Sequence, residues 1–376
     1  MDMKVKFGRA LVATFAIMAM LVVAVVGCGS DPTPTPKPAP APAAKPTATP
    51  VPPTATPLPK PKLIFAGLNW SSAAVQNEIV KAIFGPNGYG YETDEVAGGT
   101  IPLMEALTKG DVNVNLELWL PNQQAAYEKA KAKGVTREVG DTITTGAWQT
   151  AFIIPKYTAD ANPWLKSVED LKDPRAKDLF KSKLSKGKVG LVTCIPGWEC
   201  EKVNAKQVAG YGLSDHVTLI NPGSYAALNG EILGAYEKKE NIVHYYWGPE
   251  ALPGKLTGEY GGYVMLEEPP YTKACFDAMA KVEKPEDNTA ACAYPLAEVL
   301  SVVNKTQITD ENAPELISFL KKYGWTGEEI EVMLSYMADN KLKAPEVAAW
   351  ALQQDQFSAW KTWVSPEIAA KVLAGL

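Results

Sequence analysis

A proline-rich segment divides this chain of 376 residues into parts of different kinds. Thirteen of the 30 prolines lie in residues 31–62, mixed with threonine, alanine and lysine, and no apolar pattern runs through them. Such a sequence cannot form a hydrophobic core and favours extended polyproline II, which rises about 3.1 Å per residue. We therefore expect a semi-rigid tether with a reach on the order of 100 Å, and folded structure only after it.

The residues before the tether have the pattern of a targeting segment. Three basic residues among the first nine precede an apolar run over residues 10–26, which is short for a membrane-spanning helix. The run ends at Gly27 and Cys28, and this junction resembles the lipobox of bacterial lipoproteins, in which the signal is cleaved before a cysteine that carries lipid. We predict a lipoprotein signal peptide over residues 1–27, a lipid anchor at Cys28 and a tether over residues 28–62. The alternative is a retained transmembrane helix, and either way the remainder lies outside the cytoplasm, attached to the cell membrane.

About 314 residues follow the tether, which is enough for two lobes with separate cores. The whole chain has a net charge of −5. Residues 1–27 carry +2 and residues 28–62 carry +3, which leaves −10 on the folded part. An acidic body without a basic stripe argues against nucleic acid as a partner.

Four cysteines lie in the folded part, an even number in an oxidising compartment: Cys194, Cys200, Cys275 and Cys292. Of the three possible connectivities, the local pairs Cys194–Cys200 and Cys275–Cys292 are favoured. Zinc is the competing interpretation, but neither spacing matches a zinc half-site, and the chain has only two histidines. We predict two disulfides, no metal and no cofactor.

Three tryptophans each follow a predicted strand and lie at or before a turn that contains proline. These are Trp119 at the C-terminal end of an alternating strand over residues 111–119, Trp198 in the loop after a strand over residues 188–193, and Trp247 at the end of the run over residues 242–247. Packing under a helix would explain any one of them. Because open α/β sheets bind ligands at strand ends, the repeated placement predicts a common binding site.

The loop around Trp198 combines two features that bind opposite charges. It lies between Cys194 and Cys200 and directly before a predicted helix over residues 201–210, so backbone N–H groups of Trp198, Glu199 and Cys200 are candidates to hold an anion. Aromatic faces attract cations that cannot hydrogen-bond, at about 0.5–2 kcal/mol per face. A small zwitterion with a quaternary ammonium and a carboxylate fits both features.

Four motifs carry a resemblance to a known family: Gly110-Asp111 with the strand to Trp119-Leu120-Pro121, Cys194-x-Pro-Gly-Trp198-x-Cys200-Glu201, Tyr245-Tyr246-Trp247-x-Pro249, and Tyr294-Pro295. Over residues 63–376 the chain resembles the glycine betaine and proline betaine substrate-binding proteins of ABC importers, the ProX/OpuAC-like group. The resemblance implies an α/β, two-lobed periplasmic-binding-protein fold of type II (Venus-flytrap) with the ligand cleft between the lobes. The first lobe would comprise residues 63–150 and 299–376, and the second residues 151–298.

The resemblance also implies a function. Trp119, Trp198 and Trp247 would surround the ammonium of a betaine, and backbone N–H groups of Glu199 and Cys200 would hold its carboxylate. The expected protein is a monomeric receptor that delivers a quaternary amine to an ABC permease, and not an enzyme.

Two alternatives are an extracytoplasmic hydrolase and a surface adhesin. Neither His216 nor His244 lies in a catalytic motif, which argues against a hydrolase. An adhesin would leave the strand-end tryptophans unexplained.

The chain departs from the family pattern within the expected site. Gln123 lies where the family often has a histidine that grips the carboxylate, Glu199 replaces a usual glycine, and Glu250 replaces an aromatic residue or histidine. We interpret both acids as solvated rim residues; inside the cleft they would favour a purely cationic ligand such as choline. Two further tryptophans are candidate walls of the site, Trp70 and Trp148.

The C-terminal part is predicted to be helical. Thr326 and Glu329 form a capping box at the start of one helix. Trp350, Trp360 and Trp363 are expected on the last helix as packing residues rather than ligand contacts.

Overall fold

The computed structural model describes residues 58–145 and 150–376. The signal peptide, Cys28, most of the tether and Trp148 lie outside the described residues. Within the described ranges, no helix has both the length and the apolar character needed to cross a membrane.

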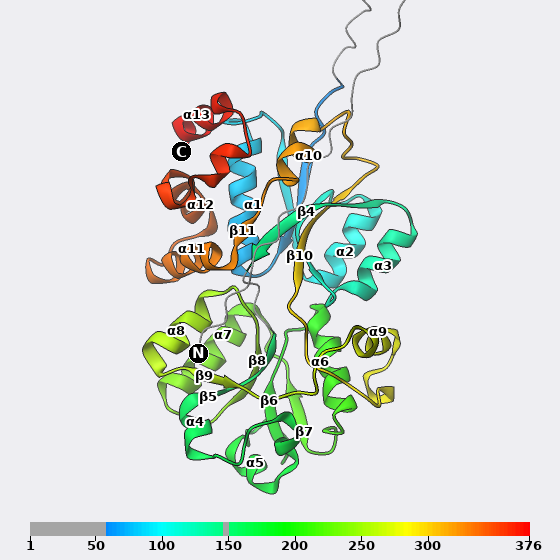
Figure 1. Ribbon diagram of the computed structural model, residues 1–376, viewed down its shortest axis with the longest axis vertical. Coiled ribbons are helices and arrows are strands. Elements are labelled where there is room, and N and C mark those ends of the chain that lie inside the picture. Colours follow the sequence, from blue (N-terminus) through cyan, green and yellow to red (C-terminus); the bar gives the residue numbers. More distant parts are fainter. Residues whose placement is uncertain (1–57, 146–149) are drawn as a thin grey trace, which may run out of the picture. The chain divides into compact units, whose positions relative to one another are not determined.

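The first sheet has six strands in the order β11-β4-β10-β3-β1-β2 (Figure 1). Its strands are β1 (Leu63–Leu68), β2 (Thr93–Gly98), β3 (Val114–Leu120), β4 (Thr136–Thr145), β10 (Glu298–Asn304) and β11 (Trp325–Thr326). The strands β1, β2 and β3 pair in parallel, whereas β10 runs antiparallel to both β3 and β4. The strand β10 therefore enters the middle of this sheet from the opposite direction.

The second sheet has five strands in the order β7-β6-β8-β5-β9. Its strands are β5 (Ala151–Pro155), β6 (Val189–Val192), β7 (Val217–Ile220), β8 (Val243–Tyr246) and β9 (Tyr263–Met265). The strands β6, β7 and β8 are parallel, and β5 runs antiparallel to its neighbours β8 and β9. The chain passes from the first sheet to the second between β4 and β5, and returns between β9 and β10.

Helices surround both sheets (Figure 1). Around the first sheet they are α1 (Ser71–Phe84), α2 (Thr100–Lys109), α3 (Gln124–Ala132), α10 (Pro314–Leu320), α11 (Gly327–Asp339), α12 (Ala344–Gln353), the 3-10 helix η3 (Asp355–Thr362) and α13 (Pro366–Gly375). Around the second sheet they are α4 (Lys156–Ala161), η1 (Val168–Lys172), α5 (Pro174–Leu179), α6 (Glu199–Gly210), α7 (Tyr225–Glu237), α8 (Ala251–Tyr260), α9 (Lys273–Lys281) and η2 (Pro285–Asp287).

The strand β3 shows why this sheet is buried on both faces. Its apolar side chains alternate with polar ones, as the sequence predicts, and Val114, Leu116 and Leu118 are fully buried. The polar side is buried as well, and Glu117 has no exposed surface. Because strands lie on both sides of β3 and helices cover the sheet, an alternating pattern here does not mark a solvent-facing side.

Local signals set the ends of several helices. The capping box of Thr326 and Glu329 is confirmed, with the Thr326 hydroxyl accepting from the Glu329 N–H at 3.1 Å. A second capping box joins Ser167 to Asp170, but the element that follows is the 3-10 helix η1 and not an α-helix. The prediction of one last helix carrying three tryptophans is wrong, because Trp350 lies in α12, Trp360 lies in η3, and Trp363 follows η3.

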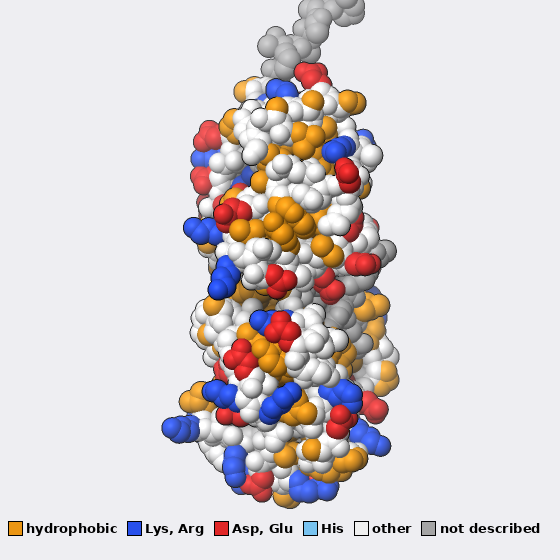
Figure 2. All heavy atoms as spheres, turned by 90° about the vertical axis from the view of Figure 1, so that its left-hand side faces the viewer, with side chains coloured by type: hydrophobic (Ala, Val, Ile, Leu, Met, Phe, Trp, Pro, Cys, Tyr) orange, Lys and Arg blue, Asp and Glu red, His pale blue; other side chains and the backbone are white. Residues whose placement is uncertain are grey.

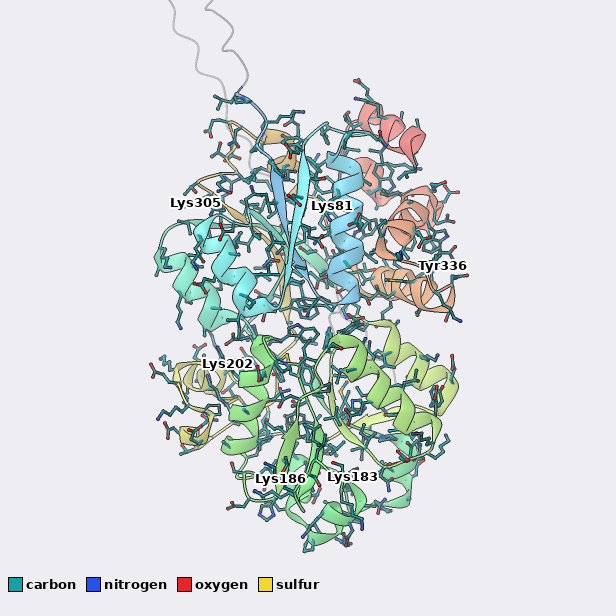
Figure 3. The ribbon with its side chains drawn as sticks, turned by 180° about the vertical axis from the view of Figure 1, so that it is seen from behind. Lys81, Lys183, Lys186, Lys202, Lys305 and Tyr336 are labelled. Carbon is teal, nitrogen blue, oxygen red and sulfur yellow. A yellow bond between two sulfur atoms is a disulfide. The ribbon has the colours of Figure 1, made fainter. Side chains whose placement is uncertain are left out.

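Charged side chains are mixed on the face that carries α11, α12 and α13 together with α4, α5 and α8. Figure 2 shows apolar patches on its upper half and many lysine and arginine side chains on its lower half, with acidic residues between them. Lys183 and Lys186 lie at the far end of the lower half (Figure 3). The described side chains of this face thus form no continuous basic stripe.

Candidate ligand-binding site

A cavity lined by four tryptophans lies where elements of the two sheets meet. The space open to the centres of water-sized molecules within it is about 40 Å³. Its walls are Trp70, Thr100, Trp119, Asn122, Gln123, Thr150, Trp198, Glu199, Cys200, Tyr245 and Trp247. The described lining therefore contains one acidic residue and no lysine, arginine or histidine.

The tryptophans reach the cavity from the ends of four strands. Trp70 follows β1 and is the N-cap of α1, Trp119 lies in β3, Trp198 follows β6 and is the N-cap of α6, and Trp247 follows β8. The geometry brings Trp119, Trp198 and Trp247 to one place, as the sequence places them, and adds Trp70. We call these four side chains the tryptophan cage.

Ring contacts fix the cage across the two lobes. Trp198 lies edge-on to Trp70, with ring centroids 5.2 Å apart, and edge-on to Trp247 at 5.1 Å. Tyr225 packs behind them, 6.3 Å from Trp198 and 6.1 Å from Trp247. Edge-on packing is a preferred aromatic geometry and leaves ring faces available to line the cavity.

One buried carboxylate holds two indoles of the cage. Oε2 of Glu117 accepts from Nε1 of Trp70 at 2.7 Å and from Nε1 of Trp119 at 3.0 Å. Its other oxygen accepts from Nε2 of Gln76 at 2.5 Å. Burial raises the pKa of Glu117, while the hydrogen bonds from the two indoles act to lower it. Because each indole has a single N–H donor, this shared acceptor fixes the orientation of both rings.

The same network runs into the C-terminal core. Gln76 accepts from the Tyr323 hydroxyl at 3.0 Å, and that hydroxyl accepts from Nε1 of Trp325 at 3.2 Å. A hydrogen-bonded chain thus joins Trp325 to Glu117 and through it to the cage. All of these side chains are buried.

Contacts between α2 and the Trp198 loop occupy part of the predicted anion site. The Glu199 N–H donates to the Thr100 hydroxyl at 2.8 Å, and the Trp198 N–H donates to the Ile195 carbonyl at 3.4 Å. A Cβ on Gly99 would lie 2.6 Å from the Gly197 carbonyl oxygen, so only glycine permits this approach. The prediction of free N–H groups is therefore wrong for Trp198 and Glu199, because the protein itself bonds them.

Glu199 and Glu250, which the sequence analysis places on a solvated rim, are both buried. Glu250 is 1% exposed, and its Oε2 accepts from the Tyr225 hydroxyl at 2.7 Å; burial raises its pKa to about 8. Glu199 is 8% exposed and forms part of the cavity wall, with Oε2 3.8 Å from Nζ of Lys202. The interpretation of both as solvated rim residues is wrong, because Glu199 is the first residue of α6 and Glu250 is the N-cap of α8, and both are buried there.

The structure also describes Gln123, the four cysteines of the folded part and the side chains that could hold a metal ion. Gln123 lines the cavity and is buried. Both disulfides are present, Cys194–Cys200 and Cys275–Cys292. Within the described ranges, no group of three potential ligands is placed to hold a metal ion.

Sequence reasoning missed several residues of the site. Glu117 and Tyr225 support the cage from behind, and Asn69 accepts from Nε1 of Trp198 at 2.6 Å. The one available signal was the acidic residue two positions before Trp119 in a strand that is otherwise apolar and amide-bearing. Tyr225 lies on α7, in a segment without a distinguishing motif.

Comparisons with known proteins show the family of this chain. The model of one protein family, described as the substrate-binding domain of ABC-type glycine betaine transport systems, matches residues 61–354. The chain belongs to this family. It is a family of substrate-binding proteins and not of enzymes, as the sequence predicts.

The chain is similar in sequence to a curated relative and similar in fold to solved structures. The glycine betaine/proline betaine-binding periplasmic protein of Escherichia coli strain K12 is 28% identical over 261 residues, covering 68% of this chain and 76% of that protein. Lactococcal OpuAC, solved closed with glycine betaine, matches with a TM-score of 0.60 and 18% identity over 81% of this chain and 100% of that one. An ABC-transporter choline-binding protein solved with choline matches with a TM-score of 0.63 and 15% identity, over 84% of this chain and 97% of that one. These structures confirm the two-lobed α/β solute-binding fold.

Proposed function

We propose that this chain is the extracytoplasmic receptor of an ABC importer and that it binds a betaine or a similar quaternary amine in the tryptophan cage. Membership of the substrate-binding family supports the transport role. The observation that carries the ligand class is a cavity walled by Trp70, Trp119, Trp198 and Trp247, with no cationic side chain among its described walls.

A methylated ammonium suits these walls because it cannot donate a hydrogen bond. Each aromatic face contributes about 0.5–2 kcal/mol of attraction, and more where water is excluded. Four indoles with most of their surface buried provide such faces. The buried side chains of Glu117 and Glu250 hold the aromatic walls in place, because Glu117 accepts from the indole N–H group of Trp70 and Glu250 accepts from the hydroxyl of Tyr225.

A purely cationic amine such as choline is the second candidate. The observation that favours it is the burial of Glu199 in the cavity wall, where many family members carry glycine, together with the occupied N–H groups of Trp198 and Glu199. A carboxylate held close to Trp198 would face this acid. Glycine betaine, proline betaine and choline must therefore be compared directly.

Calorimetric titration of the folded domain with glycine betaine, proline betaine and choline tests the ligand class. We expect saturable binding of at least one of them, and at least tenfold weaker binding by Trp198→Ala. Absence of heat with all three at millimolar concentration would exclude a quaternary-amine receptor. An unchanged affinity in Trp198→Ala would assign the loop a structural role only.

The cellular arrangement is part of the same proposal. The receptor would be a monomer tethered to the membrane by lipid on Cys28 and would release its ligand to a permease when the lobes part. Metabolic labelling with a fatty-acid analogue tests the anchor: label is expected on the wild type and absent from Cys28→Ala.

A further inference from the structure

Lys206 is a charged side chain buried beside the cage. Only 7% of it is exposed, and its ammonium has no hydrogen bond and no ion pair within 4.0 Å among the described residues. The ammonium is not among the buried polar atoms that lack a partner, so it reaches water at the wall of a groove while most of the side chain is covered. Because no acidic side chain among the described residues pairs with it, this cation is available to an anion that enters.

The cavity that Lys206 lines adjoins the cage. The two cavities share Asn122 and Glu199 as walls. The other walls of the Lys206 cavity are apolar: Pro121, Ala125, Val203, Phe276, Met279 and Ala280. These apolar walls cover the aliphatic stem of Lys206 and leave its ammonium at the border between this cavity and the groove described below.

The helix α6 directs Lys206 toward the cage. It begins at Glu199, next to Trp198, and Lys206 lies seven residues later, which is two turns or about 10 Å along the same face. Side chains on a helix lean toward its N-terminus, which brings the ammonium back toward Glu199. Figure 3 shows Lys202, on the same side of α6, at the border of the two lobes near α2, α3 and α9.

The surroundings of Lys206 are positive overall. A wider groove that continues from this cavity is lined by five lysines and three glutamates: Lys129, Lys133, Lys202, Lys206, Lys281, Glu105, Glu199 and Glu283. Two of these acids are paired, Glu105 with Lys109 at 2.7 Å and Glu199 with Lys202 at 3.8 Å. Burial lowers the pKa of Lys206, and the charge of Glu199 opposes that effect. The groove offers an entering anion a favourable field.

We infer that Lys206 is an anion subsite of the receptor, and that the preferred ligand is a trimethylammonium carboxylate whose charges lie farther apart than in glycine betaine. The inference rests on the proposed function, because the cage holds the cationic end. A short carboxylate would end near Glu199 and near N–H groups that the protein already occupies. A longer one passes Glu199 and forms a charge-assisted hydrogen bond with Lys206.

A series of homologous ligands tests the subsite. The probes are glycine betaine with one methylene between the charged groups, 3-trimethylammoniopropanoate with two, 4-trimethylammoniobutanoate with three, and choline without a carboxylate. In the wild type we expect affinity to rise from one methylene to three. In Lys206→Met the three-methylene ligand should bind at least tenfold more weakly, while choline should change by less than twofold. Lys183→Met, which removes a lysine outside both cavities and the groove, should change neither.

The outcomes separate this inference from the proposed function. If the quaternary amines bind but methylene number and Lys206→Met have no effect, the subsite is excluded and the cage stands. If no probe binds the wild type, both proposals fail. Lys206→Gln serves as a second variant, and circular dichroism confirms that each variant is folded; the wild-type methylene series decides the question if both variants unfold.

Discussion

The molecule has two groups of tryptophans that are equally buried but packed differently. In the C-terminal core, Trp325 is 1% exposed and contacts Trp363, at 4.8 Å between ring centroids, and Phe357 at 5.9 Å. In the cage, Trp198 is 3% exposed, yet it lines a cavity. Burial alone therefore does not separate these two groups of tryptophans, whereas the surroundings of their ring faces do.

The supports of the two groups differ as well. In the core, Nε1 of Trp360 donates to the Leu352 carbonyl and Nε1 of Trp325 donates to the Tyr323 hydroxyl, so neither is held by a carboxylate or an amide side chain. In the cage, the indole N–H groups and the flanking Tyr225 are held by side-chain oxygens of Glu117, Asn69 and Glu250. We infer that core tryptophans contribute mainly to stability and cage tryptophans mainly to ligand affinity, and three variants test this contrast.

The largest effect on stability is expected from Trp325→Ala. Removing a fully buried tryptophan leaves a large void, which costs about 3–5 kcal/mol of unfolding free energy. Urea unfolding measures this loss, and ligand titration under native conditions should show a much smaller change than Trp198→Ala. Equal losses of ligand affinity in Trp325→Ala and Trp198→Ala would contradict the distinction between core and cage tryptophans.

The next largest effect is expected in the pH dependence of stability. The folded state raises the pKa of Glu250 from 4.5 to about 8, so between these values it binds more protons than the unfolded state. Stability attributable to this group is therefore present at low pH and falls as pH rises from about 5 to 8, by roughly 2–4 kcal/mol.

Glu250→Gln should remove that part of the slope. Urea unfolding at several pH values measures the difference between variant and wild type. The matched control is Glu268→Gln, because burial raises the pKa of Glu268 to about 7. The fall in stability that Glu268 causes should therefore be complete at a lower pH than the fall that Glu250 causes. A parallel pH profile for Glu250→Gln and the wild type would show that Glu250 is not protonated in the folded protein.

A smaller effect is expected when the shared acceptor of two cage indoles is removed. Glu117→Leu leaves the N–H groups of Trp70 and Trp119 without their acceptor. Each unsatisfied buried donor lowers the unfolding free energy by about 1–3 kcal/mol. We expect an affinity loss of about tenfold. Glu117→Gln keeps a carbonyl oxygen for the indoles and should lose less. Calorimetry with the best ligand measures both, and equal affinities in Glu117→Leu and the wild type would contradict a positioning role.

Strand ends and loop chemistry explain what could be predicted from the sequence. Trp119 lies at the end of β3 in the first sheet, and Trp198 and Trp247 follow β6 and β8 in the second. Because α/β sheets bind ligands at the carboxyl ends of their strands, local pattern was sufficient to mark each of the three as a candidate. The close pairs Cys194–Cys200 and Cys275–Cys292 were likewise favoured by spacing. The family motifs added the two-lobed fold.

Long-range contacts explain what could not be predicted. Glu117 bonds Gln76, which bonds Tyr323, and no local pattern relates residues that are more than 200 positions apart. The strand β2 escaped notice because it is an exposed edge strand with charged residues. The burial of Glu199 and Glu250 depends on helices that begin at these residues, and sequence alone gives acids a solvated position by default.

The edge-on contacts of Trp198 have a spectroscopic consequence. Trp198 belongs to the segment after β6 and Trp70 to the segment after β1, and their rings meet at 78° with centroids 5.2 Å apart. Two indole chromophores this close, and inclined to each other, couple their electronic transitions and produce a paired signal in circular dichroism. Since that coupling decays steeply with separation, any movement of Trp70 away from Trp198 would weaken the paired signal.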